Sequence, residues 1–462
     1  MHLCVLRPRA HVAPRRSVDP IVLPPRWRLN VDHVNMRRMD RTTGGTQPGG
    51  GDRAADGSAG RAPDETLTVA EAARRLGVKP ATVYAYVSRG LLERHPSSAR
   101  RATRFRRADV ERLAGRARRT DRSPAVEAVV DTELTLLDPD GHLAYRGRDV
   151  VGLARHAGFE RTAALLWEDE EHAAWHADPA IVAVVRRALE PLPPDTDPAV
   201  LLPVVVATVR ALDPFRSDRR PEAVRAAART VVAAFVDALP AVGRPVDERI
   251  AARLWTVLAP DDTHPGPAQL RALDAALVLM ADHELAASTF ASRVAASAWA
   301  DPYGVVLTGL GPLGGALHGA MAGAAERLLV AAAGPGGAAR ALGEALAGDE
   351  VLPGFGHRVY RDRDPRADHL LGLLPGCVRV PAAAAAAGDV VRLAADRGLP
   401  APNADLGLAA LTTSLGLRPG SASTIFGLAR TVGLVAHGLE EYRHRLRFRP
   451  RATYVGEIPG GR

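Results

Sequence analysis

The sequence contains very little cysteine and lysine, and each shortage excludes a kind of chemistry. Only two of its 462 residues are cysteines, Cys4 and Cys377, and neither belongs to a CxxC pair. The sequence therefore predicts no disulfide framework and no thiolate metal site, and it favours a reducing compartment. Lys79 is the single lysine beside 59 arginines, so we find no candidate for a Schiff-base lysine.

Long apolar runs are also missing. Arg7 and Arg9 interrupt the first residues, where a signal peptide needs an unbroken apolar stretch. Later runs, such as residues 201–209, are far shorter than the roughly 20 residues that span a bilayer. Walker, GxGxxG and HExxH motifs are absent as well. We therefore expect a soluble, cytoplasmic protein.

Charge is divided unevenly along the chain. Residues 1–122 contain 26 Lys and Arg against 12 Asp and Glu, a net charge of +14, whereas the remaining 340 residues carry −6. The overall charge of +8 thus belongs to the N-terminal quarter, which favours a polyanionic partner for that part. Residues 1–63 are rich in Gly, Pro, Arg and Asp without apolar periodicity, so we expect a disordered basic tail there.

Residues 64–120 have the pattern of a small helical domain. Thr68 and Glu71 are spaced as a capping box, which predicts that a helix begins there. Gly77 ends the apolar period of this helix, and Pro80 suits the first turn of a second helix. Two helices joined by a short turn that contains glycine are typical of a helix-turn-helix.

This segment resembles the MerR-like and excisionase-like winged helix-turn-helix domains, with residues 104–107 as the wing. The resemblance implies that the second helix enters the major groove of DNA and that arginines contact phosphates. The residues expected at the DNA are Thr82, Tyr84, Arg89, Arg100, Arg101, Arg104 and Arg106. The alternatives are an interaction module without DNA and a helical appendage with a solvated basic face.

From residue 126 the sequence changes character. Residues 130–138 alternate like a short strand, and a turn leads to residues 143–147, as in a small hairpin. Segments rich in Ala, Leu and Val, broken by Pro and Gly, then continue to about Glu441. Helical periodicity dominates, so we expect a mostly α-helical fold.

Histidine, aspartate and arginine recur in distinctive settings within this second part. In chain order the segments are Ala281-Asp282-His283-Glu284-Leu285, Gly314-Gly315-Ala316-Leu317-His318-Gly319, Gly354-Phe355-Gly356-His357-Arg358-Val359-Tyr360-Arg361, Asp364-Pro365-Arg366 and Pro402-Asn403-Ala404-Asp405. Glycines before His318 and His357 let the backbone approach a ligand closely. A carboxylate base with two imidazole donors suits proton abstraction beside a carbonyl group.

Arginines in the same part could hold a small polycarboxylate, because guanidinium pairs bidentately with carboxylate. The candidates are Arg361, Arg366, Arg430 and Arg449. Two other interpretations of these residues stay open. The three histidines could bind zinc, and Asp405 could cap a helix that starts near Leu406.

Together these segments resemble the citrate synthase family over about residues 126–457. The resemblance implies a large and a small helical domain, with the small one inserted at about residues 320–425, and a homodimer with a shared active site. It implies no metal and no redox cofactor, because acetyl-CoA and oxaloacetate are substrates. Ala286 and residues 320–322 depart from the family's usual Asn and Gly-Ala-Asn, which indicates a divergent member.

The resemblance also implies catalytic roles for three residues. Asp405 would remove a methyl proton from acetyl-CoA, and His318 would hold the thioester oxygen of the resulting enolate. His357 would polarise the ketone of oxaloacetate as that carbon is attacked.

Substrate-binding roles follow in the same way. His283, Arg366 and Arg430 would bind the carboxylates of oxaloacetate. Arg449 would reach across the dimer interface into the partner's site, and Arg361 would contact a phosphate of CoA.

Citrate synthesis from acetyl-CoA, oxaloacetate and water, at the entry to the tricarboxylic acid cycle, is the predicted function. The near alternative is 2-methylcitrate synthesis from propionyl-CoA, which needs only slightly more room at the acyl methyl group. An alternative of another class is a DNA-binding regulator whose enzyme fold senses a metabolite. Its signature is loss of Asp405, His318 or His357, all of which are present.

Overall fold

A computed structural model describes residues 66–76, 83, 87, 92, 103–107, 110, 129–170, 175–348 and 351–450. Contacts divide the chain into two units, residues 1–127 and 128–462. The predicted basic tail, residues 1–63, lies outside the described residues. Among the residues expected at DNA, Thr82, Tyr84, Arg89, Arg100 and Arg101 also lie outside them.

The described part of the first unit contains a two-stranded antiparallel sheet and a helix. Its elements are β1 (Thr66–Thr68), α1 (Val69–Leu76) and β2 (Arg104–Arg106), with β1 paired to β2. The predicted capping box is confirmed, because Glu71 N donates to Thr68 Oγ1 at 3.3 Å and Thr68 N donates to the Glu71 carboxylate at 2.8 Å. Residues distant in sequence share a small apolar core: Ala72, Ala73, Val83, Leu92, Phe105 and Val110. This first unit thus buries a core of its own.

The second unit opens with a small sheet whose strand order is β3-β4-β5, all antiparallel. The strands are β3 (Thr135–Leu137), β4 (Leu143–Tyr145) and β5 (Arg148–Asp149). The predicted hairpin is therefore present, although its first strand is shorter than residues 130–138. Leu134, Leu143 and Tyr145 are buried and join the main apolar core, so the hairpin is anchored to the helices.

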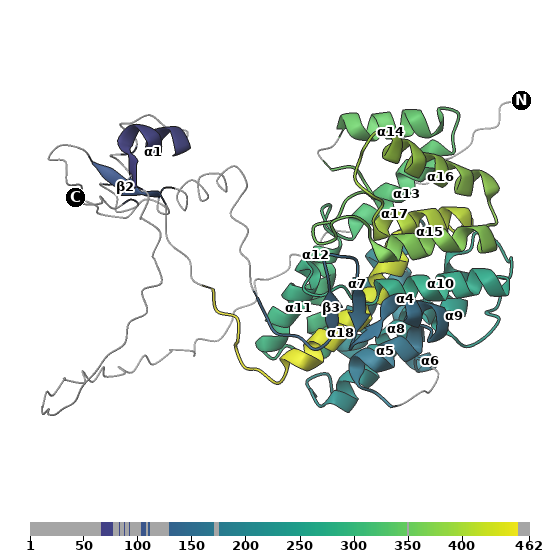
Figure 1. The fold of residues 1–462 in the computed structure, drawn as a ribbon. Coiled ribbons are helices and arrows are strands. Elements are labelled where there is room, and N and C mark those ends of the chain that lie inside the picture. Colours follow the sequence, from purple (N-terminus) through teal and green to yellow (C-terminus); the bar gives the residue numbers. More distant parts are fainter. Residues whose placement is uncertain are drawn as a thin grey trace, which may run out of the picture. The chain divides into compact units, whose positions relative to one another are not determined.

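Helices make up the rest of this unit (Figure 1). They are α4 (Val150–His156), α5 (Phe159–Trp167), α6 (Pro179–Leu189), α7 (Pro198–Leu212), α8 (Pro221–Ala238), α9 (Ile250–Leu258), α10 (Pro267–Met280), α11 (Ala287–Ser297), α12 (Pro302–Leu313), α13 (Ala320–Ala332), α14 (Gly337–Gly348), α15 (Pro365–Cys377), α16 (Pro381–Asp396), α17 (Ala404–Ser414) and α18 (Ser421–Glu441). The expectation of a mostly α-helical fold is confirmed.

The long helix α18 lies at the centre of this unit, with α7, α8, α10, α11 and α12 packed around it. Nearly every residue of α18 is buried, as expected for a helix that is apolar or small on all sides. Small residues allow close packing here. A Cβ added to Gly309 of α12 would lie 2.3 Å from the Ser292 hydroxyl of α11 and 2.7 Å from Leu434 of α18.

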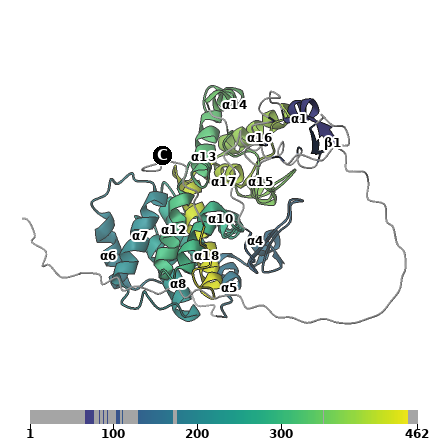
Figure 2. The same cartoon turned by 90° about the vertical axis from the view of Figure 1, so that its left-hand side faces the viewer.

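Helices α13 to α17 pack largely on one another and form a group that both views show (Figures 1 and 2). This group spans the predicted small domain at about residues 320–425. The boundaries of the domains stay predictions. No helix in the described part of the chain is long and apolar enough to cross a membrane.

Candidate active site

A cavity of about 790 Å³ lies in the second unit, where loops and helix N-termini from distant parts of the sequence meet. The first turns of α11, α15 and α17, the middle of α18 and the loops before α11, α13 and α15 line it. Six predicted site residues line it: His283, His318, His357, Arg366, Asp405 and Arg430. A second cavity of about 600 Å³, beside α4, α5 and α10, contains none of them.

Two glycines bring His357 beside the first turn of α17. Gly354 and Gly356 have φ angles of 81° and 76°, a backbone region that L side chains rarely adopt. Their loop pairs with the segment before α17, because Gly356 N donates to Ala401 O at 2.8 Å and Asn403 N donates to Gly354 O at 2.9 Å. The Asn403 amide also donates to Gly356 O at 2.9 Å. The His357 and Asp405 segments are thus one paired structure.

Backbone hydrogen bonds determine the tautomer of His357. Its Nδ1 accepts from Val359 N at 3.0 Å and from Tyr360 N at 3.2 Å. Since Nδ1 is an acceptor, the proton of the neutral ring lies on Nε2. Burial, with Arg366 nearby, lowers the pKa of His357 to about 4. His357 is therefore a neutral donor at physiological pH.

The other two histidines of the cavity are also neutral. Burial lowers the pKa of His318 to about 4, and its Nε2 lies 2.8 Å from the Ser288 hydroxyl of α11. Burial, helped by Arg366 and His357, lowers the pKa of His283 well below its ordinary value. His283 Nε2 lies 3.1 Å from the Tyr360 hydroxyl, and its ring centroid lies 5.1 Å from that of His357.

Asp405 lies in the first turn of α17 and faces the cavity. The helix begins at Ala404, and its N-cap is Asn403, whose side chain accepts from Asp405 N and Leu406 N. The alternative in which Asp405 caps a helix that starts near Leu406 is therefore wrong, and its carboxylate is available. Burial, with Asp364 nearby, raises the pKa of Asp405 to about 7 although Arg366 and Arg430 oppose the shift.

Two buried arginines supply positive charge to the cavity. Arg366, in the first turn of α15, is held by the Asp364 carboxylate through Nε and Nη2. Arg430, in the middle of α18, donates from Nε to Met280 O at 3.0 Å and lies over the Phe426 ring. Its Nη2 is buried and has no hydrogen-bond partner among the described residues. An unpaired buried guanidinium nitrogen is costly unless an anion binds it.

Two predicted binding residues lie away from the cavity. Arg361 is exposed, and its Nη1 lies 3.0 Å from the exposed Asp140 carboxylate. Arg449 is exposed beyond the end of α18. In the other unit, Arg104 Nη1 donates to the Thr66 hydroxyl at 3.2 Å, and Arg106 is exposed on the same strand. The proposed contacts of these four arginines stay predictions.

Some residues that shape the site were not singled out from the sequence. Tyr360 and Asp364 belong to the segments quoted above. Only the structure shows that Tyr360 forms a hydrogen bond with His283 and that Asp364 forms one with Arg366. Ser288, which bonds His318, carries no sequence signal except its place five residues after His283. No three His, Cys, Asp or Glu side chains of the described ranges are arranged to hold a metal ion, and the expectation that no cofactor is needed stays a prediction.

Comparison with known proteins matches both parts of the chain. Residues 126–451 match the model of the family described as citrate synthase, C-terminal domain, and residues 66–118 match that of a helix-turn-helix domain. A citrate synthase of Haloferax volcanii is 31% identical over 367 residues, which cover 71% of this chain and 94% of that protein. A 2-methylcitrate synthase of Mycobacterium tuberculosis is 28% identical over 361 residues, with 72% and 91% covered.

Solved structures show the same likeness. The ternary complex of carboxymethyl coenzyme A and oxaloacetate with citrate synthase of Thermoplasma acidophilum aligns with a TM-score of 0.60 at 25% identity, covering 72% of this chain and 96% of that chain. Citrate synthase of Pyrobaculum aerophilum aligns with a TM-score of 0.58 at 28% identity, covering 71% and 91%. The described cavity and the sequence relationship thus point to one family.

Proposed function

The chain belongs to the citrate synthase family, and on that basis we propose that it condenses acetyl-CoA with oxaloacetate and water to give citrate and CoA. One observation carries the proposal. A carboxylate with a pKa of about 7, neutral imidazoles and two buried arginines line the same cavity. This combination suits removal of a weakly acidic C–H proton next to a bound polycarboxylate.

The first step is proton abstraction from the acetyl group. Asp405 takes a methyl proton, and the electron pair of the broken C–H bond moves to the thioester, which forms an enol or enolate. The Ser288 hydroxyl lies 2.8 Å from Nε2 of His318, and we propose that it donates to this nitrogen, so that the ring proton lies on Nδ1 and can hold the thioester oxygen. Because a base with a pKa near the working pH is both ionised and strong enough, the raised pKa of Asp405 favours this role.

The second step is attack on oxaloacetate. Arg366, Arg430 and His283 bind its carboxylates, which supplies partners for the unpaired Arg430 nitrogen. His357 donates its Nε2 proton toward the ketone oxygen, where negative charge develops as the new C–C bond forms. Water then hydrolyses the citryl-CoA thioester, which releases citrate and CoA.

Further parts of the proposal concern groups outside the cavity. Closure of the α13–α17 group would exclude water until condensation is complete. Arg361 contacts a CoA phosphate, and Arg449 enters the site of a second subunit of a homodimer. Both side chains are exposed, as such contacts require. We also propose that the enzyme is cytoplasmic.

Propionyl-CoA is the alternative acyl donor, with 2-methylcitrate as the product. The similarity to a 2-methylcitrate synthase supports this alternative. One extra methylene in an apolar pocket changes binding by only about 1–3 kcal/mol, so few side chains decide between the donors.

For the N-terminal unit we propose DNA binding through phosphate contacts. The helix-turn-helix match at residues 66–118 and the charge of +14 on residues 1–122 support it. Arg104 and Arg106 lie on β2, which pairs with β1 beside α1, the position of a wing.

Substitution of Asp405 tests the enzyme proposal. Asp405→Ala should abolish condensation while oxaloacetate still binds, because the arginines and histidines remain. Calorimetry measures the binding, and release of free thiol measures turnover. The matched control is Asp396→Ala, at the exposed end of α16, which should keep full activity. Turnover of Asp405→Ala at the wild-type rate would rule out Asp405 as the base.

A further inference from the structure

The backbone around His283 is held in an unusual conformation. Glu284, the next residue, has a φ angle of 54°, in the left-handed region that costs a non-glycine residue conformational energy. Such a conformation persists only where surrounding contacts hold it. Here Glu284 N donates a hydrogen bond to Asp282 Oδ2 at 3.1 Å, so the side chain before His283 binds the backbone after it.

A second contact fixes the backbone of Asp282, on the N-terminal side of His283. The Tyr145 hydroxyl, from strand β4, donates to Asp282 O at 2.8 Å and accepts from Asp282 N at 3.0 Å. Tyr145 is fully buried, and its ring belongs to the main core. The backbone of residue 282 is therefore tied to the hairpin, 137 residues earlier in the sequence.

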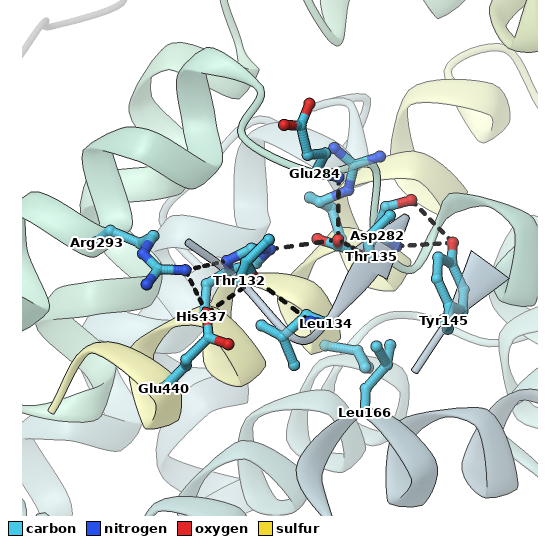
Figure 3. A network of polar contacts seen from close by, with 12 residues as sticks. Thr132, Leu134, Thr135, Tyr145, Leu166, Asp282, Glu284, Arg293, His437 and Glu440 are labelled. Carbon is cyan, nitrogen blue, oxygen red and sulfur yellow. Dashed lines mark hydrogen bonds and ion pairs between the residues drawn. The ribbon is translucent and has the colours of Figure 1, made fainter. Parts of the chain in front are cut away.

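The Asp282 carboxylate is in turn held by a buried network of polar side chains (Figure 3). Its Oδ2 accepts from the Thr135 hydroxyl at 2.5 Å and lies 3.3 Å from His437 Nε2. Arg293 Nη1 lies 3.0 Å from His437 Nδ1. Because a guanidinium can only donate, Nδ1 accepts and the proton of His437 lies on Nε2, directed at Asp282.

At the end of this network away from Asp282, two glutamates of α18 anchor Arg293. Arg293 Nε donates to Glu441 Oε2 at 2.9 Å, and Arg293 Nη1 also contacts the Glu440 carboxylate. Arg293 and Glu441 are fully buried. The backbone leaves room for Asp282 as well, since a Cβ added to Gly433 of α18 would lie 2.3 Å from Asp282 Oδ1.

We propose that Asp282 and Tyr145, supported by His437 and Arg293, are positioning residues that set the place of the His283 imidazole for oxaloacetate. Neither Asp282 nor Tyr145 lines the cavity, so they act through His283 and not on substrate. The inference rests on the proposed function only for the identity of the ligand. Their removal weakens oxaloacetate binding and spares the acyl-CoA side of the site, where His318 and Asp405 act.

Two variants and one matched control test the proposal in the full-length protein. Tyr145→Phe removes the hydroxyl that bonds the backbone of residue 282. Asp282→Asn replaces the carboxylate with an amide; Oδ2 of that carboxylate faces three donors, from Thr135, Glu284 and His437. The control is Tyr303→Phe, because the Tyr303 side chain is also buried and its hydroxyl donates to Asp213 Oδ2 at 2.9 Å, away from the cavity. If Asp282→Asn does not fold, Tyr145→Phe decides.

The first readout is hydrogen–deuterium exchange of residues 281–286 in the ligand-free protein. We expect exchange about tenfold faster in both variants, as loss of one buried hydrogen bond allows, and unchanged in Tyr303→Phe. Unchanged exchange in Tyr145→Phe would overturn the proposal. This readout needs no substrate, so a failure of the proposed reaction cannot be mistaken for a failure of the positioning role.

The second readout is kinetic. We expect the KM for oxaloacetate to rise about tenfold, while kcat and the KM for acetyl-CoA stay within about twofold of wild type. An equal rise of both KM values would indicate general loosening of the enzyme and would contradict the positioning role.

Discussion

Asp364 holds the guanidinium of Arg366 with two parallel hydrogen bonds, at 3.0 Å to Nε and 2.8 Å to Nη2. Both side chains are buried, with 1% and 5% exposed. Asp364 Oδ2 also accepts from Ala404 N at 2.9 Å, so one carboxylate joins the first turn of α15 to the first turn of α17. The arginine proposed to bind substrate carboxylates and the helix that carries the proposed base are thus positioned together.

Removal of this carboxylate should cost much stability. We expect Asp364→Ala to lower the free energy of unfolding by about 3–5 kcal/mol, because it leaves a buried arginine unpaired. Urea denaturation measures the change. The control is Asp389→Ala, whose ion pair with Arg392 is more than half exposed on both sides and should contribute about 0–1 kcal/mol. Equal effects of the two substitutions would contradict the importance of the Asp364 pair.

The rate should depend on pH through Asp405. Its pKa is raised to about 7, and only the ionised form can accept a proton. The kcat/KM for acetyl-CoA should therefore fall about tenfold per pH unit below 7 and level off above about 8. His318 and His357, with pKa values of about 4, stay neutral over this range and add no second limb. A profile that is flat between pH 6 and 8 would exclude Asp405 as the rate-limiting base.

Gly354 should be needed to position His357 in the cavity. An added Cβ would lie 2.7 Å from Leu406 Cβ, at a φ angle of 81°. We expect Gly354→Ala to destabilise the protein by about 1–3 kcal/mol and to lower kcat. Gly388→Ala is the control, since it lies inside α16 and its Cβ would meet nothing within 4 Å. That variant should be neutral or gain up to about 1 kcal/mol. Thermal unfolding and turnover of the two variants decide.

DNA binding by the N-terminal unit should depend steeply on salt. Each phosphate contact that is lost should lower the slope of log K against log salt by about 1. Arg106→Ala, on β2, is expected to show this, whereas Arg340→Ala, on α14 of the other unit, should leave affinity unchanged. Fluorescence anisotropy with a genomic fragment library at several salt concentrations measures the slope. A slope near zero for wild type would favour an interaction module.

Local patterns predicted much of this structure. The capping box of Thr68 and Glu71 could be recognised because it spans only four residues. The Gly-rich settings of His318 and His357 marked two loops that line the cavity. Six site residues predicted from separate segments line one cavity. The start of α17 was harder, since Asn403 and Asp405 can both cap a helix, and only the observed contacts of Asn403 decide between them.

Long-range pairings could not be read from the sequence. Tyr145 and Asp282 are 137 residues apart, and no periodicity relates a strand residue to a loop that distant. The contacts of Arg361 and Arg449 could not be predicted either. A pattern indicates that a cation is present, but the group that it meets depends on how the backbone places it. Arg361 meets the Asp140 carboxylate on the surface.

The most direct test is release of free thiol by the purified protein from acetyl-CoA and from propionyl-CoA, each with oxaloacetate. The proposed function predicts turnover with acetyl-CoA and a kcat/KM for propionyl-CoA that is lower by about tenfold or more. The reverse preference would make the chain a 2-methylcitrate synthase. No thiol release from either substrate by folded protein would contradict the enzymatic role itself.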